Sequence, residues 1–249
     1  MSPTHAVIIV AVGFVAGTVN TIVGSGSLLT FPTLLALGYP AVLANVSNTV
    51  GLISGSVSGA VGYRRELAGQ TKRILVLMPA VLVGTIAGAS LLLALPGSAF
   101  RHVVPILILF AVALVIVQPT IARRRASRGA RAEHPGPLLQ VGTAAVSVYG
   151  GYFGAAQGVM LLALFGITLD DDMQRLNAAK NVVAAVINAV GALFFIARTD
   201  IAWQVAGLLF VGSTFGGQLG AVIGRRLPPA VLRVTIVVVG TAVAIKLLV

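Results

Sequence analysis

The chain has 249 residues, of which 57% are hydrophobic and only 9% are charged, and its mean hydropathy is +1.02. Since a soluble domain carries about 25% charged residues, this composition indicates a polytopic membrane protein. The net charge of +11 fits arginines that flank membrane spans better than a nucleic-acid-binding surface, because no soluble basic domain is apparent. The chain has no cysteine, which excludes disulfides and thiolate metal sites, and its three scattered histidines predict no metal centre.

The first half begins with an apolar run, residues 5–37, that is too long for one membrane crossing. About 20 residues cross a hydrocarbon core of about 30 Å. Gly24 and Gly26 interrupt the run, and glycine permits unusual backbone angles and close approach. The sequence therefore predicts a helix over 5–23, a break, and a short arm over 28–37. Three apolar spans follow, over residues 41–62, 74–95 and 102–121.

The second half repeats this plan. A run over 138–166 is interrupted at Gly154 and Gly158, and further spans follow over residues 176–197, 201–223 and 230–248. The basic stretch 122–137 lies between the halves and is predicted to be a cytoplasmic loop that fixes orientation, or else an anionic-lipid patch. The predicted organisation is a first transmembrane repeat over 1–121, this linker, and a second transmembrane repeat over 138–249.

Charge counting distinguishes two topologies for the broken runs. If each run is a re-entrant hairpin, the basic loops around Arg64, Arg123 and Arg225 all lie on one side of the membrane, as the positive-inside rule favours. If each run crosses once, the Arg225 loop falls on the other side. With hairpins, the two halves enter from opposite sides. The predicted fold class is therefore an all-α polytopic membrane protein made of two broken-helix repeats of inverted topology, a common transporter plan.

Polar side chains within the predicted spans need partners, because hydrocarbon supplies none. Four polar residues recur at helical spacing and share one helix face: Asn177, Lys180, Asn181 and Asn188. Amide N–H groups and an ammonium on one face can replace the water around a small oxyanion, and the helix N-termini after the breaks add backbone donors. The predicted substrate-binding residues are Asn20, Ser25, Ser27, Asn48, Gln157, Asn177, Lys180 and Asn181. The predicted helix-break residues are Gly24, Gly26, Gly154 and Gly158.

Simpler interpretations of these polar residues stay open. The amides could bond between helices and hold the bundle together, and Lys180 could extend its ammonium to the membrane surface. The acidic trio Asp170, Asp171 and Asp172 precedes a predicted span, where carboxylates suit a helix N-terminus. No Ser/His/Asp set, carboxylate pair or histidine cluster lies within a span, so we expect neither an enzyme nor a cofactor nor a metal site.

Two segments resemble a known family. GFVAGTVNTIVGSGSLLTFPTLLALGYPAVLANVSN, residues 13–48, resembles the first repeat of the sulfite exporter TauE/SafE family, also called the toluene sulfonate uptake permease family. YGGYFGAAQGVMLLALFGITLDDDMQRLNAAKNVVAAVINAVGALFF, residues 149–195, is similar to its second repeat. The chain departs from the family pattern in two places: the first glycine cluster is Gly-Ser-Gly-Ser, and Ala155, Ala156 and Gln157 stand where glycines are common.

The resemblance implies a small-anion permease of bacterial cytoplasmic membranes, associated with sulfite, sulfonates and related compounds. We therefore expect a permease or secondary transporter that binds a sulfite, organosulfonate, related oxyanion or carboxylate between the two broken helices near the midplane. The alternatives are an anion channel and a non-transporting membrane scaffold. The expected partners are the small anion and the lipid bilayer, with a homodimer as a candidate assembly and no nucleic acid. The coupling ion stays open.

Overall fold

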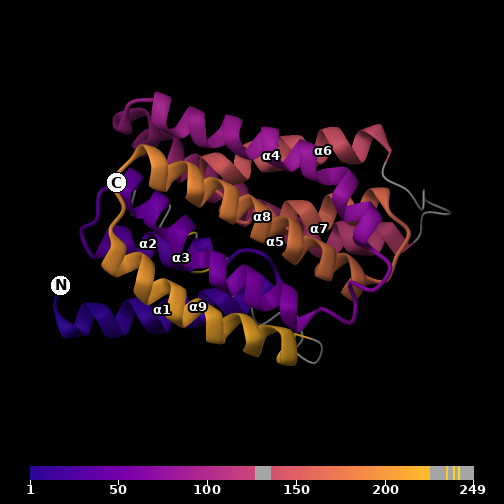
Figure 1. Ribbon diagram of the computed structural model, residues 1–249, viewed down its shortest axis with the longest axis horizontal. Helices are drawn as coiled ribbons and strands as arrows, with labels where there is room; N and C mark the ends of the chain where they lie inside the picture. The colour runs from indigo at the N-terminus through magenta and orange to yellow at the C-terminus, as the bar shows by residue number, and fades with distance from the viewer. Residues whose placement is uncertain (127–135, 225–233, 235–237, 239–240, 242–249) are drawn as a thin grey trace.

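A computed structural model describes residues 1–126 and 136–224, with residues 234, 238 and 241, and its regular elements in these ranges are helices (Figure 1). The predicted all-helical class is thereby confirmed for the described residues. The helices are α1 (Pro3–Ile22), α2 (Ser27–Ala36), α3 (Ala41–Gly62), α4 (Thr71–Ala94), α5 (Gly97–Ala126), α6 (Pro137–Tyr152), α7 (Gln157–Thr168), α8 (Met173–Arg198) and α9 (Trp203–Ile223).

The described helices suit a membrane. Four of them, α1, α4, α8 and α9, are long and apolar enough to cross one by length and composition. Large apolar side chains cover the outside of the bundle, for example Val7, Val83 and Leu193, which are 69%, 70% and 67% exposed. Such a surface is stable in lipid and aggregates in water. Helix α5 continues past residue 121 into the predicted linker, whereas the rest of the linker and most of the predicted span 230–248 lie outside the described residues.

Each broken run forms a helical hairpin. Helix α2 folds back along α1, because Gly26 lies against Ala16 and the Tyr39 hydroxyl after α2 lies 3.8 Å from the sulfur of Met1. Helix α7 folds back along α6 in the same way, with Gly142 beside Leu164 and Gln157 beside Gly150. A helix interrupted by four residues thus returns to the end of the bundle from which it came.

The first helix of each hairpin packs against a helix of the other half. Helix α1 lies along α9 at the bottom of Figure 1, and α6 lies along α4 at the top. Both pairs are parallel, since Gly13 and Gly17 meet Leu209 and Ser213, and Gly84 and Gly88 meet Ala144 and Val148. Small residues allow this close backbone approach, which drives helix association in lipid.

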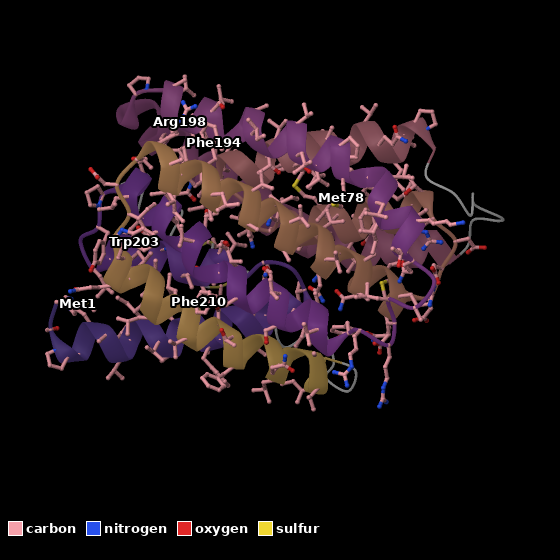
Figure 2. All side chains as sticks on the ribbon, in the orientation of Figure 1. Met1, Met78, Phe194, Arg198, Trp203 and Phe210 are labelled. Atoms are coloured by element: carbon pink, nitrogen blue, oxygen red, sulfur yellow. The ribbon has the colours of Figure 1, made fainter. Side chains whose placement is uncertain are left out.

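Helices α3 and α8 cross the centre of the bundle in opposite directions. Thr49 of α3 lies beside Gly191 of α8, and Ser56 bonds to Asn188. The chain therefore has two distinct ends, which we name by residues. The Met1 end holds the start of α1 and the end of α8, and Figure 2 shows Met1, Arg198 and Trp203 toward it. The Arg73 end holds the starts of α4 and α8.

An aromatic cluster fixes the hairpins relative to one another. The rings of Phe31 in α2 and Phe153 in the second break lie 5.2 Å apart in an edge-to-face arrangement, and Phe100 of α5 lies 6.0 Å from Phe153. All three side chains are buried. Edge-to-face pairs of this kind add about 0.5–1.5 kcal/mol each to the burial of their area. The cluster therefore couples the position of one hairpin to the other.

Candidate substrate-binding site

The two breaks touch each other through their backbones. The amide of Gly158, in the first turn of α7, donates a 3.1 Å hydrogen bond to the carbonyl of Gly24, in the first break. A Cβ placed on either residue would lie 2.5 Å from the other's Cα, so no side chain fits between them. Residues 134 positions apart in sequence are thus held in direct contact, and the N-terminus of α7 faces the first break.

The two breaks begin with the same backbone turn. In the first, the amides of Val23 and Gly24 both donate to the carbonyl of Val19, at 2.8 and 3.2 Å. In the second, the amides of Phe153 and Gly154 both donate to the carbonyl of Tyr149, at 2.9 and 3.1 Å. Gly24 and Gly154 follow with φ of +88° and +75°, a left-handed conformation that glycine adopts without strain.

The other two predicted break glycines have different places. Gly26 precedes α2 in the ordinary helical conformation and lies against the carbonyl of Ala16. Gly158 is inside α7, so it contributes close approach and not a turn. The second break instead uses Ala156 in the left-handed conformation, with φ of +57°. An alanine in that conformation costs about 1–2 kcal/mol relative to glycine, so Ala156 is a strained position.

The polar face of α8 binds the open end of α1. Lys180 donates to the carbonyls of Asn20 and Thr21 at 3.0 and 3.2 Å. Asn177 and Asn181 both donate to the Thr21 carbonyl, at 3.2 and 3.3 Å. The last carbonyls of a helix have no intrahelical partner and carry a partial negative charge, so these three side chains cap and neutralise the C-terminal end of α1.

Lys180 does not reach the membrane surface. Its side chain is 0% exposed, and it is the only charged side chain among the buried residues that the structure describes. The alternative in which its ammonium extends to the interface is therefore wrong. A buried ammonium is costly unless it is paired and hydrogen-bonded, and the two carbonyls of α1 supply the bonds.

The C-terminal end of α6 is capped by one side-chain amide, whereas the end of α1 is capped by three side chains. Asn45 of α3 donates to the carbonyl of Tyr152, the last residue of α6, at 3.1 Å. Asn45 was not among the predicted site residues. Its position could have revealed it, since Asn45 and Asn177 are each the fifth residue of their helix, and Asn48 and Lys180 are each the eighth.

A chain of side-chain hydrogen bonds joins the two breaks. Gln157, at the start of α7, donates to the Asn188 side chain at 3.0 Å, and Asn188 donates to the hydroxyl of Ser56 at 3.0 Å. Asn20, at the end of α1, donates to the same hydroxyl at 3.1 Å. Asn188 lies on the polar helix face predicted from the sequence but was not among the predicted substrate-binding residues, and neither was Ser56. This chain links α7, α8, α3 and α1.

Asn48 fixes the start of α2. It accepts a hydrogen bond from Thr30 and donates to the hydroxyl of Ser27 at 3.3 Å. The structure thus groups the predicted residues by helix end: Asn20, Asn177, Lys180 and Asn181 lie at the end of α1, Asn48 and Ser27 at the start of α2, and Gln157 at the start of α7.

Several buried oxygens in this region have no hydrogen-bond partner. The Ser25 hydroxyl is the most telling, because Ser25 is 1% exposed and sits in the first break just before α2. A buried hydroxyl without a partner costs about 1–3 kcal/mol, so such groups mark strained or ligand-binding places. The side-chain oxygens of Thr21, Asn45, Gln157 and Asn177 share this property.

The sequence matches one family model over nearly its whole length. The model of the sulfite exporter TauE/SafE family covers residues 9–247. The chain belongs to the TauE/SafE family. Similar curated proteins include the probable membrane transporter protein YfcA of Escherichia coli, which is 25% identical over an alignment 253 residues long that covers 100% of this chain and 91% of that protein.

Two further relatives agree with this membership. A probable membrane transporter protein of Haemophilus influenzae is 24% identical over 96% of this chain and 93% of its own length. A probable membrane transporter protein of a Sinorhizobium species is 27% identical over 94% and 89%. No solved structure matches this TauE/SafE chain. Family and relatives identify a multi-pass membrane transporter of the TauE/SafE type.

Proposed function

We propose that this TauE/SafE chain is a secondary permease that binds a small oxyanion between its two interrupted hairpins. The anion is a sulfite, an organosulfonate or a related oxyanion or carboxylate. One observation supports this site above all: the breaks meet at Gly24 and Gly158, so that the N-termini of α2 and α7 come together inside the bundle. Helix N-termini present free backbone N–H groups and a partial positive charge, which together favour anions.

An interrupted helix presents an electrostatic difficulty to an anion. Each break creates a positive helix end, at α2 or α7, directly beside a negative one, at α1 or α6. The negative ends would repel the anion unless they were neutralised. Lys180, Asn177 and Asn181 neutralise the end of α1, and Asn45 covers the end of α6. The polar residues of α3 and α8 therefore leave the positive ends dominant.

The roles follow from these contacts. Lys180 and the capping amides set the sign of the local field, whereas Ser25 and Ser27 face the anion. The Gly158 amide joins them as a donor when the two breaks move apart, since it bonds to the Gly24 carbonyl in the conformation described. Asn48 and Gln157 hold the two helix starts in place through Ser27 and Asn188. When the tips of the hairpins, meaning the two breaks, separate, the capping amides of Asn177 and Asn181 also become available as donors to the anion.

The halves work as inverted-topology repeats in this proposal. The first hairpin enters from the Met1 end and the second from the Arg73 end, which the positive-inside rule makes cytoplasmic because Arg64, Arg65 and Lys72 lie there. Alternating access then comes from one repeat rocking against the other around the site between the breaks. The membrane is the bacterial cytoplasmic membrane.

Flux in proteoliposomes tests this function. Purified chain should transport one of sulfite, thiosulfate, methanesulfonate or a small carboxylate with saturation, and Lys180→Met should abolish that transport while the protein stays folded. Flux that never saturates would indicate a channel. Absence of flux for every anion, together with a stable protein partner on purification, would indicate a scaffold and overturn the proposal. A rise in melting temperature with the transported anion gives an independent readout of binding.

A further inference from the structure

A cluster of charges joins the two halves at the Arg73 end. Asp171 lies in the turn between α7 and α8, and its two carboxylate oxygens accept from Arg73 and Arg175, each at 2.7 Å. Arg73 belongs to α4 of the first half, while Asp171 and Arg175 belong to the second. Arg175 also donates to the carbonyl of Ala68, in the turn between α3 and α4, at 3.0 Å.

A buried glutamine completes this connection. The Gln70 side chain, 1% exposed, donates to the carbonyls of Glu66 and Arg175 at 2.8 and 2.9 Å. Its oxygen accepts from Arg73 at 3.3 Å. Two side chains of the first half thus bind the start of the second: Arg73 binds Asp171, and Gln70 binds the carbonyl of Arg175. Together these bonds fix the turn before α8 against α4.

The equivalent junction at the Met1 end is made differently. There the turn between α8 and α9 meets α3 through the amide of Ala202, which donates to the Ser47 hydroxyl at 2.9 Å. Ile201 and Ala202 otherwise pack against the apolar cluster that includes Leu34 and Ala44. Among the described residues no ion pair joins the halves here, and Arg198 instead lies over the ring of Phe194 in its own helix, 5.5 Å from the centroid (Figure 2).

The two closures differ in what opening them costs. Opening the apolar contact exposes buried hydrocarbon, and the cost grows with the area uncovered. Opening the charged contact at a membrane surface returns three charges and the Gln70 amide to water, which can hydrate all of them, and partly exposed ion pairs contribute only about 0–1 kcal/mol of net free energy. The charged end is therefore the easier one to open and close repeatedly.

We propose that the Arg73–Asp171–Arg175 cluster is the latch that keeps the cytoplasmic end of the transporter closed in the state seen here. The inference rests on the proposed function, since it assumes that the two halves move against each other. Asp171 lies in the turn that directly follows α7, the second helix of the second hairpin. Movement of α7 is therefore coupled to breakage of the Arg73–Asp171 pair. The Met1 end relies on apolar packing.

Single-cysteine accessibility tests the latch directly, because the natural chain has no cysteine. Ala178→Cys places a probe at a fully buried site one turn beyond Arg175, beside buried Tyr63. Ala44→Cys places a matched probe at a buried site toward the Met1 end. Each probe is combined with Asp171→Asn, which removes the charge without changing the shape, or with Asp170→Asn at the exposed neighbour. Labelling by a thiol reagent is measured in liposomes.

We expect Asp171→Asn to raise the labelling rate of the Ala178→Cys probe about fivefold or more, the shift that about 1 kcal/mol produces. The Ala44→Cys probe and the Asp170→Asn control should stay unchanged. Exchanging the charges in Arg73→Asp with Asp171→Arg should restore slow labelling. Unchanged labelling at Ala178→Cys, or an equal rise at both probes from general loosening, would overturn the latch. A selective rise in a chain that transports no anion would uphold the latch and contradict the proposed function.

Discussion

The two helix breaks share a backbone design and differ in the side chains that complete them. Both begin with two amides on one carbonyl, of Val19 or Tyr149, followed by a left-handed glycine. At the first break an ammonium and two amides cap the preceding helix, whereas at the second a single amide of Asn45 does so. The single buried charge of the described residues, on Lys180, therefore belongs to only one of two otherwise similar structures.

Under the proposed function, this difference gives the two hairpins different tasks. Both supply a positive helix end to the centre of the bundle, but only the first is neutralised by a full charge. An anion placed between the tips lies in a field that is more positive on the side of Lys180. Breaking the shared backbone design should therefore disable both halves, while changes to the caps should affect the first half more than the second.

The largest effect is expected from separating the tips. Gly158→Ala would place a Cβ 2.5 Å from the Cα of Gly24, and Gly24→Ala adds left-handed strain, so we expect a loss of about 2–5 kcal/mol of stability and no transport. Gly38→Ala is the matched control, because Gly38 has φ of +89° with nothing within 4 Å of its Cβ position. It should cost only about 1 kcal/mol. Equal melting temperatures for the Gly24→Ala and Gly38→Ala variants would refute tip contact.

The caps provide a comparison of the two halves. Lys180→Met should weaken anion binding by about tenfold or more, because the negative end of α1 loses its neutralising charge. Lys180→Arg should retain most binding, and Asn45→Ala should weaken it less than Lys180→Met does. Titration by thermal shift measures all three. A stronger effect of Asn45→Ala than of Lys180→Met would reverse the division of tasks proposed here.

The chain of side-chain hydrogen bonds between the breaks should weaken when the Asn188 side chain at its centre is removed. Asn188→Ala leaves Gln157 and Ser56 without their shared partner, and an unsatisfied buried polar group costs about 1–3 kcal/mol. We expect a lower melting temperature and slower transport. Thr214→Ala, at a half-buried residue of α9 whose hydroxyl bonds only within its helix, should change neither. A wild-type melting temperature for Asn188→Ala would show that this chain of hydrogen bonds contributes nothing.

The latch should be insensitive to pH in the neutral range. Burial alone would raise the pKa of Asp171, but hydrogen bonds from Arg73, the Asp172 amide and Arg175 outweigh it, so the pKa lies below its ordinary value. A depressed carboxyl pKa gives stability that is present above the ordinary value and lost as the pH falls through the lowered one. The labelling rate of the Ala178→Cys probe, divided at each pH by the rate of the same thiol in denatured protein to correct for thiol ionisation, should therefore be constant from about pH 5 to pH 8 and rise only in stronger acid. A rise of this ratio centred near neutral pH would contradict this charge state.

The smallest effect is expected at Ala156. Ala156→Gly relieves left-handed strain of about 1–2 kcal/mol but loses the burial of one methyl group, worth about 0.8 kcal/mol. We therefore expect a change in stability of less than about 1 kcal/mol, with transport retained. Denaturation of the purified protein measures it. A destabilisation comparable to that of Gly24→Ala would mean that the left-handed conformation of Ala156 carries no strain for glycine to relieve.

The positions of the breaks could be predicted from the sequence, because run length and glycine act locally. The shared face of Asn177, Lys180 and Asn181 could be predicted for the same reason. Their partners could not, since the carbonyls of Asn20 and Thr21 become available only when α1 ends at Ile22 and meets α8 in space. The pairing of α1 with α9 and of α6 with α4 likewise depends on contacts between distant segments.

The acidic trio shows the same limit at smaller scale. The sequence predicts capping carboxylates before α8, and Asp172 does cap it, accepting from the Gln174 amide at 2.8 Å. Its neighbour Asp171 binds Arg73, 98 residues earlier in the chain, which no local pattern reveals. An acidic residue just before a helix thus predicts the cap by Asp172 correctly, but it does not predict the contact of Asp171 with Arg73 in the other half.

The most direct test of the anion site is protection of Ser25. In the cysteine-free chain, Ser25→Cys places a thiol in the first break, and Lys72→Cys places a control thiol on an exposed helix start. The transported anion, supplied as a sulfonate because sulfite consumes maleimides, should slow maleimide labelling of the Ser25→Cys thiol at concentrations that saturate transport and leave the control unaffected. Labelling of the Ser25→Cys thiol at the same rate with and without a saturating anion would contradict binding between the breaks.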